Sequence, residues 1–287
     1  CASAPLPIGD CRVNDQTPSW VRSEPGKPGL EGVNWGGLYT LYIKEVRRFF
    51  KVQMQTVWAP AVTTLLYLII FTVAMGRQGR EVLGVPFADF LAPGLIIMAM
   101  INNSFQNASF SLLVGKMQGT IVDYLMPPLS TGELIAGLIG GAVTRAFLVG
   151  FAVWIIMIFW PGVHVTIHHP LSVIWFGLMG SLLLGLIGLL TSLWADKFDH
   201  AAAISNFFVT PMTLLSGTFY SVEQLSPTFR AISHMNPFFY IISGFRHGFL
   251  SEADSPIYVG GIALLLLNII LFAICYAVLK SGWKIKN

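Results

Sequence analysis

Carboxamide and hydroxyl side chains gather inside two stretches of this sequence that are otherwise strongly apolar. Side chains of these types avoid lipid, and they mark either contacts between helices or a water-filled path. The sequence leaves open whether they bond neighbouring helices or touch a transported substrate. They are Asn102, Asn103, Gln106 and Asn107 in the first stretch, and Ser205, Asn206 and Thr210 in the second.

A single basic residue, Arg145, lies inside another apolar run. A charge at membrane depth is a candidate functional residue by default. If the spanning helix begins near Gly140, however, the side chain can extend to the cytoplasmic interface instead. Both interpretations stay open.

Bond-making chemistry has little support in the sequence. His164, His168 and His169 cluster in WPGVHVTIHHP, but this is a proline-bounded loop with no acidic residue or cysteine close by, which does not favour a metal site. HExxH, GxSxG and Rossmann glycine patterns are absent, as is the phosphate loop GxxxxGK[ST]. We therefore expect no enzyme site and no cofactor in this chain. If ATP drives the protein, another chain binds it.

The composition indicates which solvent these residues meet. Hydrophobic residues make up 54% and charged residues 11% of the 287 positions, whereas soluble domains carry ~25% charged residues. A membrane-spanning helix needs ~20 mostly apolar residues. The sequence therefore predicts an all-α integral membrane protein with six transmembrane helices. These spans cover about 56–75, 88–113, 135–160, 171–193, 201–217 and 257–279.

The basic residues near the span ends predict the orientation. With a cytoplasmic N-terminus, more of them lie inside than outside, as the positive-inside rule requires. We therefore expect both termini in the cytoplasm, which agrees with an even number of spans. The inner residues are Lys44, Arg47, Arg48, Lys51, Lys116, Lys197, Lys280, Lys284 and Lys286, and the outer ones are Arg77, Arg80, Arg230 and Arg246.

Residues 1–33 are rich in proline and glycine and have little apolar periodicity, which predicts a flexible cytoplasmic tail. The first residue is Cys1, as in a mature bacterial lipoprotein, but that would place the N-terminus outside. An incomplete or trimmed start fits the charges better. Residues 34–287 are expected to form one transmembrane domain.

Residues 35–53 predict an amphipathic helix. Basic residues recur on one face, and apolar and aromatic residues lie on the opposite side. Such a helix lies in the plane of the membrane interface, or packs on protein as an ordinary amphipathic helix. Its position directly before the first span favours the interface. Its polar residues include Lys44, Glu45, Arg47 and Arg48.

The link between the second and third spans, GKMQGTIVDYLMPPLSTGEL, is too apolar for a simple hydrophilic loop. Pro127 and Pro128 end whatever helix precedes them. A short helix that offers apolar residues to the cytosol is a docking surface for a partner. Alternatively, the segment folds back on the membrane surface.

The segment 217–256 before the last span is also unusually apolar. Asn236 followed by Pro237 is a favourable helix start. The run after it is about 14 residues, which is too short to span a membrane. We expect a re-entrant or interfacial helix on the outer side.

Four segments in this order resemble the permease subunits of the ABC type-2 exporter family over roughly residues 34–287. IKEVRRFFKVQMQTVWAP is similar to the family's interface helix running into span one, and FLAPGLIIMAMINNSF to its start of span two. DYLMPPLSTGELIAG resembles its cytoplasmic coupling segment. TPMTLLSGTFYSVEQLSP and HMNPFFYIISGFRHGFL resemble its signature before the last span.

The resemblance implies an exporter of the bacterial inner membrane that carries a drug, a lipid or a glycan. Two copies would pair with two separate ATPase subunits, which bind ATP and Mg. The substrate path would run at the dimer interface along spans two and five, with Leu214 and Leu215 at the place of an apolar gate. The ATPase would grip the interface helix and a coupling segment, Gly119, Thr120, Ile121, Val122, Asp123, Tyr124, Leu125, Met126, Pro127 and Pro128.

Other functions fit less well. A secondary transporter or channel often shows inverted repeats and midspan charge pairs, and we find no convincing repeat. A membrane enzyme needs converging His, Asp or Glu within its spans, which are absent. An anchoring subunit would explain the apolar dock but not the polar second span. No run of basic residues points to nucleic acid.

Overall fold

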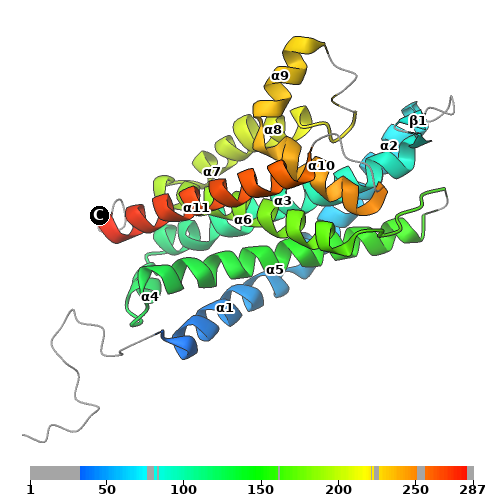
Figure 1. Cartoon of the computed structure of the whole chain (residues 1–287). Coiled ribbons are helices and arrows are strands. Elements are labelled where there is room, and N and C mark those ends of the chain that lie inside the picture. The colour runs from blue at the N-terminus through cyan, green and yellow to red at the C-terminus, as the bar shows by residue number, and fades with distance from the viewer. Residues whose placement is uncertain are drawn as a thin grey trace, which may run out of the picture.

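Helix α3 (Phe87–Met117) is the helix around which the others pack in the computed structural model of the chain (Figure 1). Its most apolar window is 83% buried, against 17% for residues 54–74 and 22% for α11 (Ile257–Ser281). The second span is thus the core of the bundle, and the first and last spans lie at its surface. The residues that the structure describes are 33–75, 81–82, 84–160, 162–220, 222, 226–250 and 256–282.

The start of α1, the short helix α4 and the end of α11 lie at one end of the bundle, which we call the α4 end (Figure 1). A two-stranded antiparallel hairpin, β1 (Glu81–Val82) and β2 (Val85–Pro86), lies at the opposite end. The other helical elements are α1 (Trp35–Phe50), η1 (Met54–Trp58), α2 (Ala59–Met75), α4 (Val122–Leu125), α5 (Thr131–Ile158), α6 (Pro170–Trp194), α7 (Phe198–Ile204), η3 (Ser205–Val209), α8 (Thr210–Leu215), α9 (Pro227–Met235) and α10 (Pro237–Leu250).

Among the described residues, 5 helical segments are long and apolar enough to cross a membrane. They correspond to five of the six expected spans, and their ends differ by a few residues. The difference is largest where polar residues extend a helix, as in α3, because hydrogen bonds within the helix do not stop at the edge of an apolar run. The five segments are 54–74, 87–117, 131–158, 170–194 and 257–281.

The expected span 201–217 is built from three short helical pieces, α7, η3 and α8. The middle piece is a π-helical turn, and Pro211 follows it in the first turn of α8. Proline has no N–H to donate and crowds the carbonyl four residues earlier, so a widened turn before it relieves the clash. That this segment crosses the membrane stays a prediction.

The segment before the last span contains two helices, α9 and α10. As predicted, a helix begins at Pro237, and the side chain of Asn236 accepts a hydrogen bond from the Phe238 N–H at 3.1 Å. α10 has 14 residues and is buried along most of its length against α3, α6 and α11. Its buried Arg246 donates to the Gly217 carbonyl at 2.9 Å. Whether α10 is re-entrant in a bilayer stays a prediction.

The contact between α3 and α6 is a close approach of two backbones. A Cβ atom at Gly188 would lie 2.5 Å from the Phe105 carbonyl oxygen and 3.1 Å from the Ser109 nitrogen. Small residues allow such an approach in membranes, where packing and hydrogen bonds hold helices together. Ser104 adds a hydrogen bond to the Ser181 carbonyl at 2.6 Å across the same contact.

We expect Gly188→Ala to lower the stability of the bundle by about 1–3 kcal/mol, because the added methyl group meets backbone atoms that cannot rotate away. Thermal unfolding in detergent measures this change. Gly132→Ala is the matched control, since a Cβ there meets nothing within 4 Å. That variant should be neutral or slightly more stable. Equal melting temperatures for both variants would contradict the backbone contact.

Candidate functional site

Helix α1 packs along α5, and both helices run in the same direction from the α4 end (Figure 1). Two glycines of α5 make room for it. A Cβ at Gly137 would lie 2.7 Å from Leu41, and a Cβ at Gly141 would lie 2.7 Å from the Cβ of Glu45. The predicted amphipathic helix is therefore present but ends at Phe50 rather than at 53, and it is packed on protein. Its position relative to a membrane interface stays a prediction.

One carboxylate fixes the starts of both helices. Glu133 accepts from the backbone N–H of Asn34 at 2.7 Å and from that of Ser130 at 2.7 Å. The Asn34 side chain in turn accepts from Gly37 and donates to the Pro128 carbonyl at 3.3 Å. The end of the predicted coupling segment is thus hydrogen-bonded to the cap of α1.

Glu45, an acidic residue in the middle of α1, is fully buried, with 0% exposure. Its carboxylate pairs with Arg48 at 2.9 Å and accepts from the Ser111 hydroxyl at 2.9 Å. The Tyr124 hydroxyl donates to it at 3.4 Å. A buried carboxylate is stable only when paired and hydrogen-bonded. Glu45 therefore ties α1, α3 and α4 together.

Two arginines, one on α1 and one on α5, donate hydrogen bonds to asparagines of α3. Arg48 donates to both the carbonyl and the side-chain oxygen of Asn107 at 3.0 Å. Arg145 of α5 donates to the side-chain oxygen of Asn103 at 2.8 Å, one turn away. Of the two interpretations of Arg145, the structure favours the one inside the bundle, because the side chain is buried and directed at α3.

The coupling segment divides into an inward and an outward part. Tyr124 is 7% exposed, and the ammonium group of Lys44 lies 3.6 Å from its ring centroid. Burial, and next the charge of Glu45, raises the pKa of Tyr124, so its hydroxyl keeps its proton and donates. Tyr124 therefore faces inward, and its part in coupling to an ATPase stays a prediction. Among the coupling residues whose side chains the structure describes, Val122 and Met126 are apolar and face outward, at 51% and 77% exposure; the side chain of Leu125 lies outside that description.

The rest of the coupling segment lies at the surface. Gly119 has a φ of +70°, which favours glycine and turns the chain out of α3. Ile121 is half-buried, and Thr120, Asp123, Pro127 and Pro128 are exposed. The segment thus offers a small mixed surface at the α4 end, beside the exposed Lys44 and Arg47 of α1.

A polar cavity of about 440 Å³ brings together most residues of the predicted path. Carboxamides and hydroxyls from α3, η3 and α8 line the cavity. Helices η1 and α2 form its remaining wall. Charged side chains are absent from its lining among the described residues. The predicted residues that line it are Asn102, Asn103, Gln106, Ser205, Asn206 and Thr210.

Three predicted path residues lie elsewhere. Asn107 faces Arg48 instead of the cavity. Leu214 and Leu215 are not part of its lining; Leu214 is 41% exposed, and the Leu215 carbonyl accepts from the Tyr220 hydroxyl at 3.0 Å.

The cavity wall formed by η1 and α2 was not predicted, because its polar residues are spread along an apolar run. Positions 55, 59, 63 and 67 recur every four residues, which places them on one helix face. That spacing is a signal in the sequence for Gln55, Thr63 and Tyr67; position 59 in the series is an alanine, and Thr64 lies one residue outside it. The missed polar lining residues are Gln55, Thr63, Thr64 and Tyr67.

The histidines do not converge. His164 pairs with Asp89, with its Nδ1 3.5 Å from the carboxylate, whereas His169 stacks on His247 with ring centroids 4.8 Å apart. His168 contacts the Phe249 carbonyl. In the described part of the chain, no three His, Cys, Asp or Glu side chains come close enough to hold a metal ion. What the cavity and the network offer is hydrogen bonding and a conformational link.

Comparison with known proteins agrees with this architecture. Residues 37–250 match the family described as ABC-2 type transporter. The Inner membrane transport permease YadH of Escherichia coli (strain K12) is 35% identical over 253 residues, which cover 88% of this chain and 98% of that protein. Nodulation protein J of Sinorhizobium fredii is 29% identical over 216 residues, 72% of this chain and 77% of that protein. The chain belongs to the ABC-2 type transporter family, as a membrane transport permease.

Proposed function

We propose that this permease works in an ATP-driven exporter of the bacterial inner membrane, as two copies of the chain with two separate ATPase subunits. Both termini lie in the cytoplasm, and ATP and Mg are bound by the ATPase. The observation that carries the proposal is the continuous polar link from α4 through Glu45 and Arg48 to α3. This link joins the surface at the α4 end to a helix that lines the polar cavity.

The link is suited to transmit a movement. If the ATPase displaces α4, Tyr124 moves relative to Glu45, and the carboxylate must follow or lose a hydrogen bond. Separating Glu45 from Arg48 leaves a buried charge without its partner, which costs about 3–5 kcal/mol. Moving α1 together with α4 costs less. Arg48 then pulls on Asn107, so α3 and its face of the cavity change position as a unit.

The cavity is the proposed translocation path, and its lining limits the substrate. Amides and hydroxyls satisfy hydroxyl or amide groups of a substrate, but they do not neutralise a charge. The group that passes through is therefore uncharged and polar, as in a glycan or the headgroup of an amphiphile. In the resemblance to exporter permeases the path runs between two copies, so each copy would supply one such wall.

Co-expression with an ATPase encoded beside this chain tests the proposal. We expect a stable complex that hydrolyses ATP in lipid in a vanadate-sensitive manner. If no ATPase binds under any nucleotide condition, an ATP-independent carrier or channel replaces the exporter.

Substitutions at two residues of the coupling segment, Tyr124 in α4 and Met126 just after it, should have different effects. Met126→Asp places a charge on the outward surface and should abolish association with the ATPase, whereas Tyr124→Phe should leave association intact. Tyr124→Phe removes a hydrogen bond to a carboxylate and should lower coupled hydrolysis roughly fivefold, equivalent to about 1 kcal/mol. Pull-down and hydrolysis assays on the two variants measure this. Unchanged coupling in Tyr124→Phe would remove Glu45 from the transmission route.

Uncharged glycolipids should stimulate hydrolysis by the reconstituted complex, and cationic amphiphiles should not. Gln55→Leu removes one cavity amide and should raise the half-maximal concentration roughly threefold to tenfold, the value of one hydrogen bond. Gln53→Leu is the matched control, since Gln53 is equally exposed but does not line the cavity. Stimulation by charged amphiphiles alone would contradict the substrate class.

A further inference from the structure

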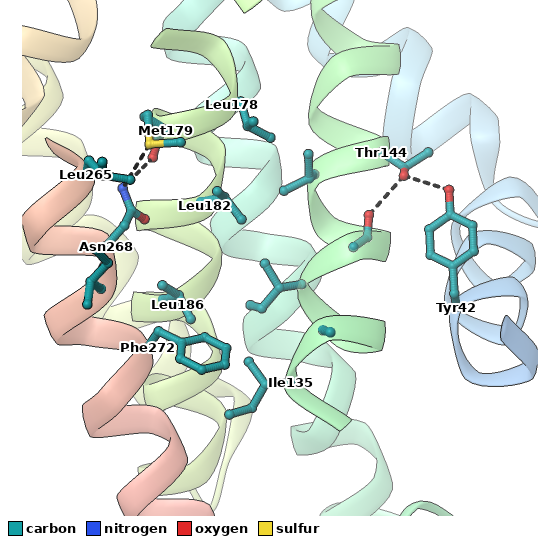
Figure 2. A pocket seen from close by; sticks show the side chains of 15 residues that line it. Tyr42, Ile135, Thr144, Leu178, Met179, Leu182, Leu186, Leu265, Asn268 and Phe272 are labelled. Carbon is teal, nitrogen blue, oxygen red and sulfur yellow. Dashed lines mark hydrogen bonds between the residues drawn. The ribbon is translucent and has the colours of Figure 1, made fainter. Parts of the chain in front are cut away.

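A second hollow, of about 650 Å³, lies between α5, α6 and α11, and we call it the α5–α6–α11 groove (Figure 2). Its lining is apolar except for Tyr42, Thr144 and Asn268. It shares no lining residue with the polar cavity. The two hollows are therefore separate, and their linings suit different chemical groups, hydrocarbon in the groove and polar groups in the cavity.

Hydrogen bonds on both sides keep the groove open. Asn268 of α11 donates to the Met179 carbonyl of α6 at 3.2 Å, which holds α11 against α6. The hydroxyl of Tyr42 in α1 lies 2.9 Å from the hydroxyl of Thr144 in α5. The Thr144 hydroxyl donates to the Gly140 carbonyl at 2.9 Å. α11 thus packs against α6, and α1 packs against α5. The space between α5 and α11 is left unfilled (Figure 2).

The depth of the groove matches one leaflet of a bilayer. On α5 its lining runs from Ile135 to Thr144, a rise of about 14 Å at ~1.5 Å per residue. Half of a hydrocarbon core of ~30 Å is about 15 Å. On α5 the lining lies toward the α4 end, since Ile135 is only four residues from the start of that helix, whereas on α6 and α11 the lining residues span the middle of each helix. All three walls are helices long and apolar enough to span a membrane, so hydrocarbon surrounds the opening.

Side chains suited to a lipid headgroup continue from the groove toward the α4 end. On α11, Tyr276 and Lys280 lie on the same face as the lining residues Leu265 and Ile269, because they follow at helical spacing. The Lys280 ammonium group lies 6.0 Å from the Tyr276 ring centroid, and its side chain is exposed.

On α1, Trp35 and Tyr39 form one stripe with Tyr42 and are 72% and 65% exposed. Aromatic rings of this kind sit at headgroup level. On α11, Lys280 carries the charge that attracts a phosphate group.

We propose that the α5–α6–α11 groove binds one acyl chain of an anionic phospholipid from the leaflet at the α4 end, with the lipid phosphate at Lys280. An apolar hollow that opens to lipid gains contacts when a hydrocarbon chain fills it. The bound lipid packs against Tyr42, one helical turn before Glu45, and so contacts α1 next to the polar network. The proposal does not depend on an ATPase or on a transported substrate.

Native mass spectrometry of the detergent-purified chain tests this binding. The protein is delipidated and then offered phosphatidylglycerol and phosphatidylethanolamine with identical acyl chains. We expect one retained lipid per chain and a preference for phosphatidylglycerol. Lys280→Gln should remove the preference while the bound chain remains. A lipid-free wild-type protein, or equal retention of both headgroups, would overturn the proposal.

Two adjacent leucines provide the matched pair. Leu265→Trp places an indole in the groove and should lower retention about tenfold, since displacing about two methylene groups has that effect. Leu266 is 55% exposed and does not line the groove, so Leu266→Trp should retain lipid like the wild type. Equal retention in the two variants would place the lipid elsewhere. Lipid on monomers but never on dimers would mean that a second copy covers the groove, which also overturns the proposal.

Discussion

The arrangement of the α4 end depends on one carboxylate that is fully removed from solvent. Glu45 is accommodated there by Arg48, which pairs with it, and by the hydroxyls of Ser111 and Tyr124, which donate hydrogen bonds to it. It also needs space, which Gly141 provides by letting the α1 backbone approach α5. Each partner comes from a different part of the chain, so the charge cannot be accommodated until α1, α3 and α4 are in place. Burial of a charge thus specifies the packing more strongly than burial of an apolar residue would.

This constraint gives α1 a role in every proposed function of the chain. One face of α1 carries Glu45 and Arg48 to α3, which lines the polar cavity. Tyr42 of α1 lines the α5–α6–α11 groove. Its start is joined to the coupling segment through Asn34 and Pro128. If α1 moves, as the proposed mechanism requires, the cavity, the groove and the coupling segment would be affected together, and the occupancy of each site would influence the others.

Hydropathy predicted five of the spans because lipid selects apolar runs, and Asn236–Pro237 predicted the start of α10 because proline fits a first turn. The polar residues of α3, η3 and α8 that line the cavity were predicted for a related reason, because amides inside a span need hydrogen-bond partners. The inward position of Tyr124 could not be predicted, since an apolar segment at a surface has two faces and only tertiary contacts choose between them. The burial of Glu45 could not be predicted either, because a single acidic residue within a basic helix can face solvent or protein.

The polar network is not fully satisfied. Arg48 Nη1, Arg145 Nε and Asn107 Nδ2 are buried and have no hydrogen-bond partner within the described chain. Such groups cost about 1–3 kcal/mol each unless water reaches them or the structure changes. An arrangement that left no group unpaired would be locked in one state. In the proposed mechanism, unpaired groups would lower the cost of leaving this arrangement for a second one. The incomplete bonding lies between the coupling segment and the cavity wall, which is where that mechanism places the moving part.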